Sequence, residues 1–151
     1  MTHRAQQIIE AAAAALVVRD VAQVFTHRRL TLAELDFEVP AFIVDLGADQ
    51  PLSELGYTNA ALIDSRLELN VAAIVQGSTE SEIIPALLEM RRQAHIAMLA
   101  ATDHTLGLAF VLAVRYAGAE MPIVNADGNR LAGLLVSRWS IDYRMTLGDP
   151  A

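Results

Sequence analysis

Two segments of the chain alternate between apolar and polar residues, a pattern that predicts β-strands with one buried side. Between Asp64 and Val75 the apolar positions share one side: Leu67, Leu69, Val71, Ala73 and Val75. In the closing run, Leu135 to Met145, one side carries Leu135, Ser137, Trp139, Ile141, Tyr143 and Met145. Each run is about twice the usual strand length of roughly 5–6 residues. At about 3.3 Å per residue each could reach about 35 Å. Since strands of that length tend to extend beyond their own core, we expect the closing strand to serve assembly rather than catalysis.

Two other segments place apolar residues at helical spacing. Residues 2–18 predict a helix with Thr2 as its N-cap and a buried stripe formed by Ile8, Ile9, Ala12, Ala15 and Leu16. Residues 80–101 predict a second helix, capped by Ser78 or Thr79, with a stripe formed by Ile83, Leu87, Met90, Ala94 and Met98. Pro85 lies inside this helix and is tolerated only if the helix starts near Ser81 or kinks.

The rest of the chain predicts shorter strands. Ala22–Phe25 is a strand candidate, and Pro40 opens a compact apolar strand over residues 41–46. The stretch from Gly47 to Asn59 is the longest predicted loop, and residues 106–124 suggest one or two strands with a bulge. Residues 125–129 carry a hairpin-turn signal. The order of helix, three strands, helix and two strands indicates one α+β domain over residues 1–151. Its mostly antiparallel sheet packs both helices on one face and ends in a long β-hairpin.

The composition excludes several classes of protein. Hydrophobic residues make up 54% of the chain, but no run of about 20 apolar residues suggests a membrane span. There is no cysteine, which excludes disulfides and thiolate chemistry. The formal net charge is −7, and every basic side chain apart from histidine is an arginine. Because such a chain repels DNA, we expect no sequence-specific nucleic-acid partner. Since no apolar span is present, we also expect no membrane partner.

No group of residues predicts catalysis or a cofactor. His95, Asp103 and His104 suggest a metal site, but we expect His95 to lie on the solvated helix face beside Arg91 and Arg92. The acidic residues of 34–38 alternate as carboxylates in a hydrolase do, yet no basic or histidine partner accompanies them: Glu34, Asp36 and Glu38. We therefore expect no catalytic residue, no metal, no cofactor and no enzymatic activity.

The polar sides of the two long strands are more informative. They carry charges of both signs, and they form the candidate assembly surface: Arg66, Glu68, Asn70, Arg138, Asp142 and Arg144. If the strands pair, each cross-strand ion pair contributes roughly 0.2–1 kcal/mol. The alternative is an outer sheet face that only meets solvent.

The layout as a whole resembles the phage tail terminator family (minor tail protein U-like) of long-tailed phages. The resemblance spans nearly all of the chain and rests on its segments in combination: RAQQIIEAAAAAL, VFTHRR, PAFIVDL, SRLELNVAAIVQG and SRWSIDYRM. Proline-led strands and strands ending in an alternating aromatic pattern occur in many folds, so no one segment is diagnostic. The loop from Gly47 to Asn59 departs from expectation, because it is poor in the charges and aromatics of a strong contact.

The resemblance implies a structural virion protein, made in the bacterial cytoplasm and carried in the tail of a phage or prophage particle. It would form a hexameric ring on the major tail tube protein, end tube polymerisation and offer a docking surface to the head-completion protein. Six copies would carry 6 × −7 = −42 charges, and such a ring repels DNA. The alternatives are another neck or tail component, such as a head-completion or tube-like protein, and a small ligand-binding or enzymatic α/β domain.

Overall fold

The computed structural model describes residues 3–26, 40–51, 62–100, 105–127 and 130–146. The elements follow in the order α1 (Arg4–Arg19), β1 (Gln23–Thr26), β2 (Ala41–Pro51), β3 (Leu62–Gly77), α2 (Glu80–Ala100), β4 (Val111–Ala119), β5 (Ile123–Asp127) and β6 (Arg130–Thr146).

The strands form one sheet in the order β1-β2-β3-β6-β4, and β5 also pairs with β6. Only β1 and β2 are parallel; the other described pairs are antiparallel. The two predicted long strands pair along their whole length, from Leu62 opposite Thr146 to Gly77 opposite Leu131. β4 pairs with the C-terminal half of β6 and β5 with its N-terminal half. The predicted α+β class with a mostly antiparallel sheet and a C-terminal hairpin is confirmed.

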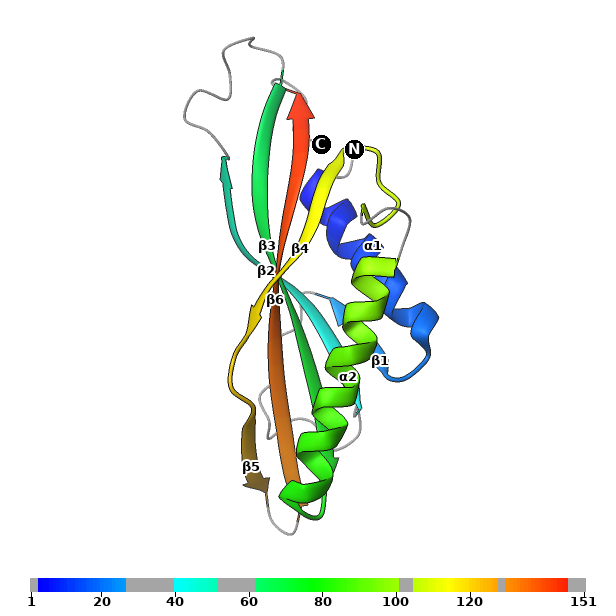
Figure 1. Cartoon of the computed structure of the whole chain (residues 1–151), viewed down its shortest axis with the longest axis vertical. Helices are drawn as coiled ribbons and strands as arrows, with labels where there is room; N and C mark the ends of the chain where they lie inside the picture. The colour runs from blue at the N-terminus through cyan, green and yellow to red at the C-terminus, as the bar shows by residue number, and fades with distance from the viewer. Residues whose placement is uncertain (1–2, 27–39, 52–61, 101–104, 128–129, 147–151) are drawn as a thin grey trace.

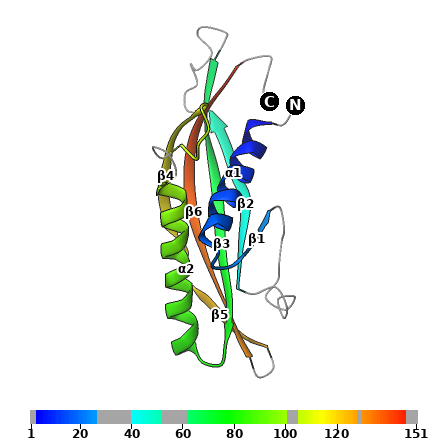
Figure 2. The same ribbon diagram turned by 90° about the vertical axis from the view of Figure 1, so that its right-hand side faces the viewer.

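Both helices pack on the same side of the sheet, which we call the covered face (Figures 1 and 2). The two helices lie side by side, offset along the strands: α1 packs mainly on β1 and β2, and α2 packs on β3 and β6. At one end, where Leu62 pairs with Thr146, both strands extend past α1 in the two views. The predicted overhang is therefore present at this end.

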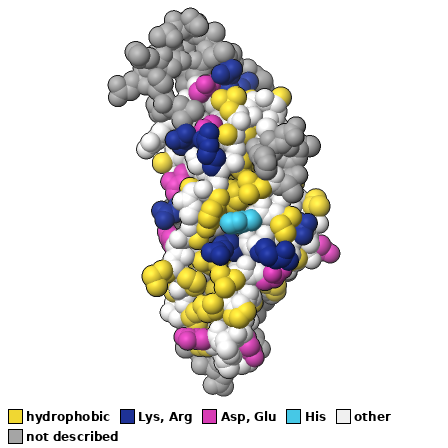
Figure 3. All heavy atoms as spheres, viewed as in Figure 1, with side chains coloured by type: hydrophobic (Ala, Val, Ile, Leu, Met, Phe, Trp, Pro, Cys, Tyr) yellow, Lys and Arg dark blue, Asp and Glu magenta, His cyan; other side chains and the backbone are white. Residues whose placement is uncertain are grey.

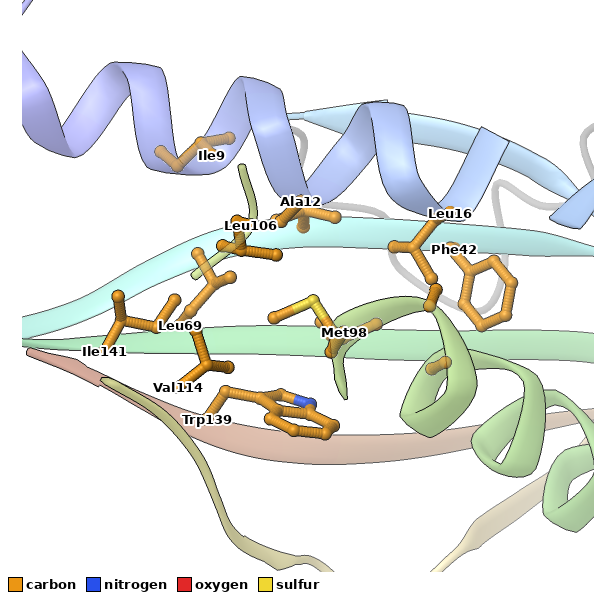
Figure 4. Packing of buried hydrophobic residues seen from close by; sticks show 14 of the residues in the cluster. Ile9, Ala12, Leu16, Phe42, Leu69, Met98, Leu106, Val114, Trp139 and Ile141 are labelled. Atoms are coloured by element: carbon orange, nitrogen blue, oxygen red, sulfur yellow. The ribbon is translucent and has the colours of Figure 1, made fainter. Parts of the chain in front are cut away.

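The core forms where the helix stripes meet the apolar side of the strands. Figure 4 shows Ile9 and Leu16 of α1 on one side of the core and Trp139 on the other, with Leu69 and Met98 between them. The predicted core residues with described side chains are buried on β3 and β6: Leu67, Leu69, Val71, Ala73, Val75, Leu135, Ser137, Trp139, Ile141 and Tyr143. The hydroxyl of Ser137 donates to the Val71 carbonyl (3.1 Å) and accepts from the Trp139 indole N–H (3.4 Å). These bonds allow a polar residue in an apolar layer.

Two predictions of element boundaries were wrong, those of the α1 N-cap and of the end of β2, while the predicted start of α2 is confirmed. The N-cap of α1 is His3, not Thr2, because the His3 ring nitrogen accepts from the Ala5 amide (3.0 Å). β2 continues to Pro51, since its pairing with β3 resumes after a bulge between Leu46 and Asp49. The first residues of the predicted loop are thus strand, and 52–59 lie outside the described residues. α2 begins at Glu80 and continues through Pro85, and the Ser78 amide donates to the Glu82 carboxylate (2.9 Å).

Candidate functional site

The opposite side of the sheet, the open face, carries the polar residues of β3 and β6, and no described helix lies on it (Figures 1 and 2). The antiparallel register brings the predicted residues together. Arg66 lies opposite Asp142, Asn70 opposite Arg138, and Asp64 opposite Arg144. The last pair forms an ion pair, with 2.8 Å between Arg144 Nε and Asp64 Oδ1. The candidate residues therefore belong to one continuous surface.

Asp142 is the centre of this surface. Its carboxylate accepts from Arg66 at 2.8 Å and 3.2 Å, and from Arg115 of β4 at 2.6 Å. Asp142 is only 5% exposed, whereas the two arginine side chains are 50% and 56% exposed. The hydrogen bonds from Arg66, with those from Arg115, hold the pKa of Asp142 below its usual value against the opposing effect of burial. The aspartate therefore stays ionised and fixes two guanidinium groups at the surface.

This geometry changes the role of one predicted residue. Asp142 was expected to face a partner, but its burial between two arginines makes it a positioning group for them. Sequence reasoning missed Arg115, because residues 106–124 gave no clear alternation and the bulges of β4 hide its register. β4 shifts register between Val111 and Ala113 and again between Tyr116 and Gly118. The pairing of Arg115 with Ser140 and its ion pair with Asp142 place it on the open face.

Three arginines lie close together on the open face. Arg138 is on β6, while Arg115 of β4 is paired with Ser140 and Arg66 of β3 is paired with Asp142. They therefore lie on three neighbouring strands, and Arg66 and Arg115 converge on the carboxylate of Asp142 from either side of β6. We call these three residues the arginine row. Arg138 is exposed and forms no ion pair among the described residues.

A groove of about 390 Å³ runs beside the arginine row. Gln50 of β2, Arg66 and Glu68 of β3 and Arg138 of β6 line it. A Cβ added to Gly47 would lie 2.8 Å from the Glu68 carboxyl carbon, so Glu68 lies directly over this glycine. Glycine thus lets a carboxylate of the surface fold back onto β2, away from the row.

His95 does not lie on the solvated face of α2, as the sequence had suggested. Its ring is half-buried against Tyr116 (4.3 Å between centroids) and Trp139 (5.2 Å). Its Nε2 atom is buried and has no hydrogen-bond partner among the residues that the structure describes. Burial, and then the charge of Arg91, lower the pKa of His95. The ring therefore joins the edge of the core, because α2 passes close to β4.

The edge of the sheet made by β4 and β5 carries an apolar surface that sequence reasoning missed. Four large side chains within residues 112–123 are substantially exposed: Leu112 at 45%, Tyr116 at 39%, Met121 at 86% and Ile123 at 46%. Figure 3 shows hydrophobic side chains over the middle and lower part of this view, with charged groups among them as well as above. The strand edge is therefore a second surface suited to a protein contact.

A cleft of about 520 Å³ lies near the other edge, lined by Val21, Pro40, Val75, Ala86 and Met90 together with Gln76, Glu89 and Gln93. The Glu89 carboxylate is occupied by Arg92 (2.8 Å) and Gln93 (3.0 Å). Within the described ranges no three metal-ligating side chains come together. Asp103 and His104 of the suggested metal site, and Glu34, Asp36 and Glu38, lie outside the described residues. No described helix is long and apolar enough to cross a membrane.

Comparison with known proteins places these features in no family. No family model matches the chain, and no curated protein matches its sequence. Among solved structures, a chain of the "Virion of native gene transfer agent (GTA) particle" aligns with 12% identity and a TM-score of 0.40. The alignment covers 89% of this chain and 91% of that one.

Proposed function

We propose that the chain is a non-enzymatic structural protein of a phage or prophage virion that forms a ring on the end of the tail tube. In this role it ends tube polymerisation and presents a docking surface to the head-completion protein. The chain is made in the bacterial cytoplasm and remains in the tail of the finished particle. The ring is hexameric, as in the tail terminator family that the sequence resembles.

The observation that carries the proposal is the charged face of the β3–β6 pair, on which no described helix lies. Strands of 16 and 17 residues pair over their whole length, yet only one of their two faces is covered by helices. On the other face a buried aspartate fixes arginines toward solvent. One part of this face buries a small apolar cluster around Ile43 and Ile74, and the length and charge of the remainder suit contacts with neighbouring subunits.

The apolar edge of β4 and β5 supports the same function. A ring of identical subunits needs two different contact surfaces on each copy, which meet head to tail. The open face and the apolar edge are two such surfaces, and they differ in position and in chemistry. An exposed apolar edge of this kind is also typical of a protein that buries the edge against a neighbouring molecule.

The proposal is tested with the purified chain and with tail tubes assembled from the tube protein encoded beside it. We expect sedimentation velocity to show hexamers, either of the chain alone or when tubes are present. Electron microscopy should show density at one end of each tube, and added chain should stop tube elongation. A chain that stays monomeric and never binds tubes contradicts the proposal. Binding along the tube wall, rather than at its end, would indicate a different tail component.

A competing function is tested in parallel. The cleft beside Val21 and Met90 is large enough for a small molecule. A thermal-shift screen against metabolites and metals should leave the unfolding temperature unchanged if the chain is a ring subunit. A shift of several degrees at micromolar ligand would instead favour a ligand-binding domain.

A further inference from the structure

We propose that Met121, at the corner between β4 and β5, inserts into the cleft beside Val21 and Met90 of a second copy of the chain. The inference rests on the ring assembly proposed above and names the contact through which the apolar edge of one subunit meets the next. It adds the cleft to the two contact surfaces already described and leaves the open face for a separate contact.

The first support is the way in which the corner presents Met121. Its side chain is 86% exposed, the highest value among the exposed large hydrophobic residues of the described chain. The amide of Glu120, just before it, donates to the Val136 carbonyl (2.9 Å) and so ties the corner to β6. Pro122, just after it, restricts Met121 to an extended backbone. The corner therefore holds outward an unbranched apolar side chain that adapts to an irregular apolar site.

The second support is the apolar lining of the cleft. Clefts of about 300–1,000 Å³ hold whole small molecules, so one of about 520 Å³ has room for Met121 and its neighbours. Val17 and Val18, in the last turn of α1, are 58% and 81% exposed and extend the apolar surface shortly before Val21. An apolar edge on one side of the sheet and an apolar cleft near the other give each copy two complementary sites. Five apolar side chains line the cleft: Val21, Pro40, Val75, Ala86 and Met90.

The third support is charge complementarity around the two sites. Glu120 is exposed beside Met121 and forms no ion pair among the described residues. At the cleft, Arg19 Nε donates to the lining residue Gln93 (2.8 Å), and Arg19 likewise has no ion pair in the described part of the chain. The Glu89 carboxylate of the cleft is already paired within α2 (2.8 Å). Because the whole chain carries −7, bringing an unpaired acid to an unpaired arginine offsets the general repulsion between copies.

The cleft of the same copy is out of reach of Met121. In the strand order β2 and β4 are three strand spacings apart, about 14 Å at about 4.8 Å per spacing. Pro40 of the cleft directly precedes β2, whereas Met121 follows the edge strand β4. Contact between two identical edges is also disfavoured, because a two-fold axis at Met121 brings two Glu120 carboxylates together. The edge and the cleft therefore meet between copies, head to tail, as a ring requires.

The experiment uses the absence of cysteine from the chain, which lets introduced thiols report the contact directly. Met121→Cys and Val21→Cys are made in one chain, which is assembled with tail tubes and treated with a short bismaleimide cross-linker. We expect denaturing gels to show covalent oligomers up to the hexamer, because each copy then links its edge to the cleft of the next. Each single variant should stay monomeric on the gel. Dimers from Met121→Cys alone would show that two edges meet, and that result overturns the inference.

A second variant measures the same contact without cross-linking. Met121→Asp should raise the concentration needed for assembly at least about tenfold, measured by sedimentation velocity with tubes present, because it places a charge in an apolar cleft. Its unfolding temperature should match that of the native chain, since the residue is 86% exposed. Ala14→Asp adds the same charge on the exposed side of α1 and should assemble normally.

The outcomes separate this contact from the ring itself. Hexamers that give no cross-linked product with both thiols present, or native assembly by Met121→Asp, overturn the inference and leave the ring proposal standing. A small molecule that binds the cleft in a thermal-shift assay and leaves assembly unchanged also overturns it, because the cleft is then open in the ring. A native chain that never assembles, with or without tubes, overturns both proposals.

Discussion

Alternate residues of β3 and β6 point to opposite faces of the sheet, and the two faces differ in chemistry and in role. On the covered face the side chains are apolar and buried, and Trp139, Ile141 and Tyr143 are 0% exposed. On the open face Arg66 and Arg115 form ion pairs with Asp142, and both arginine side chains reach solvent. The covered face therefore determines the fold, while the open face is free to evolve toward a partner. Substitutions on the two faces should separate stability from assembly.

The largest expected difference is between adjacent residues of β6. Trp139→Ala removes a fully buried ring and should lower the free energy of unfolding by about 3–5 kcal/mol. Arg138→Ala, on the open face, should change it by no more than about 0.5 kcal/mol. Urea denaturation followed by circular dichroism measures both, since Trp139 is the one tryptophan and its loss removes the fluorescence signal. Equal losses would show that the open face also holds the fold.

Two glycines give a second comparison. A Cβ at Gly133 would overlap Ile83 Cγ2, where α2 packs closely on β6. Gly133→Ala should therefore force the helix outward and cost about 1–3 kcal/mol. A Cβ at Gly47 meets only the flexible end of Glu68 on the open face, so Gly47→Ala should cost no more than about 0.5 kcal/mol. Thermal unfolding should rank the two variants in this order, and the reverse order would contradict the packing of α2.

The contrast between the faces also explains how far the sequence predicted the structure. Alternation identified the buried side of both long strands, because a one-residue shift would expose every apolar side chain. Their pairing was only a provisional inference from the sequence, and the register establishes it. It could not identify Arg115, since β4 is short and twice bulged, nor the end of β2, whose residues beyond Leu46 lack an apolar side. The candidate surface was thus predicted as a set of residues on one face. The burial of Asp142 depended on a third strand that the alternation did not place.

Asp142 should make the open face sensitive to pH. Its folded-state pKa is lowered, chiefly by the hydrogen bonds from Arg66, so its ionisation stabilises the fold above the usual pKa of 3.8. That contribution is lost as the pH falls through the lower folded-state pKa. Asp142→Asn should cost about 1–3 kcal/mol at pH 7, because two arginines then lack their anion. Urea midpoints between pH 7 and pH 2 should converge for the native and variant chains, and parallel curves would exclude this role.

The smallest expected effect is at His95, where the covered face meets the apolar edge. Burial and Arg91 lower the pKa of His95 from its usual 6.5, so the unfolded chain takes up a proton more readily than the folded chain. Stability should therefore fall as the pH drops below about 6.5, by less than about 1 kcal/mol because solvent reaches part of the ring and screens its charge. His95→Phe keeps a ring against Tyr116 and Trp139 and removes the unpaired Nε2. Its unfolding temperature should change less than that of the native chain between pH 7.5 and pH 5.5. An equal change in both would place the acid sensitivity elsewhere than at the contact of α2 with β4.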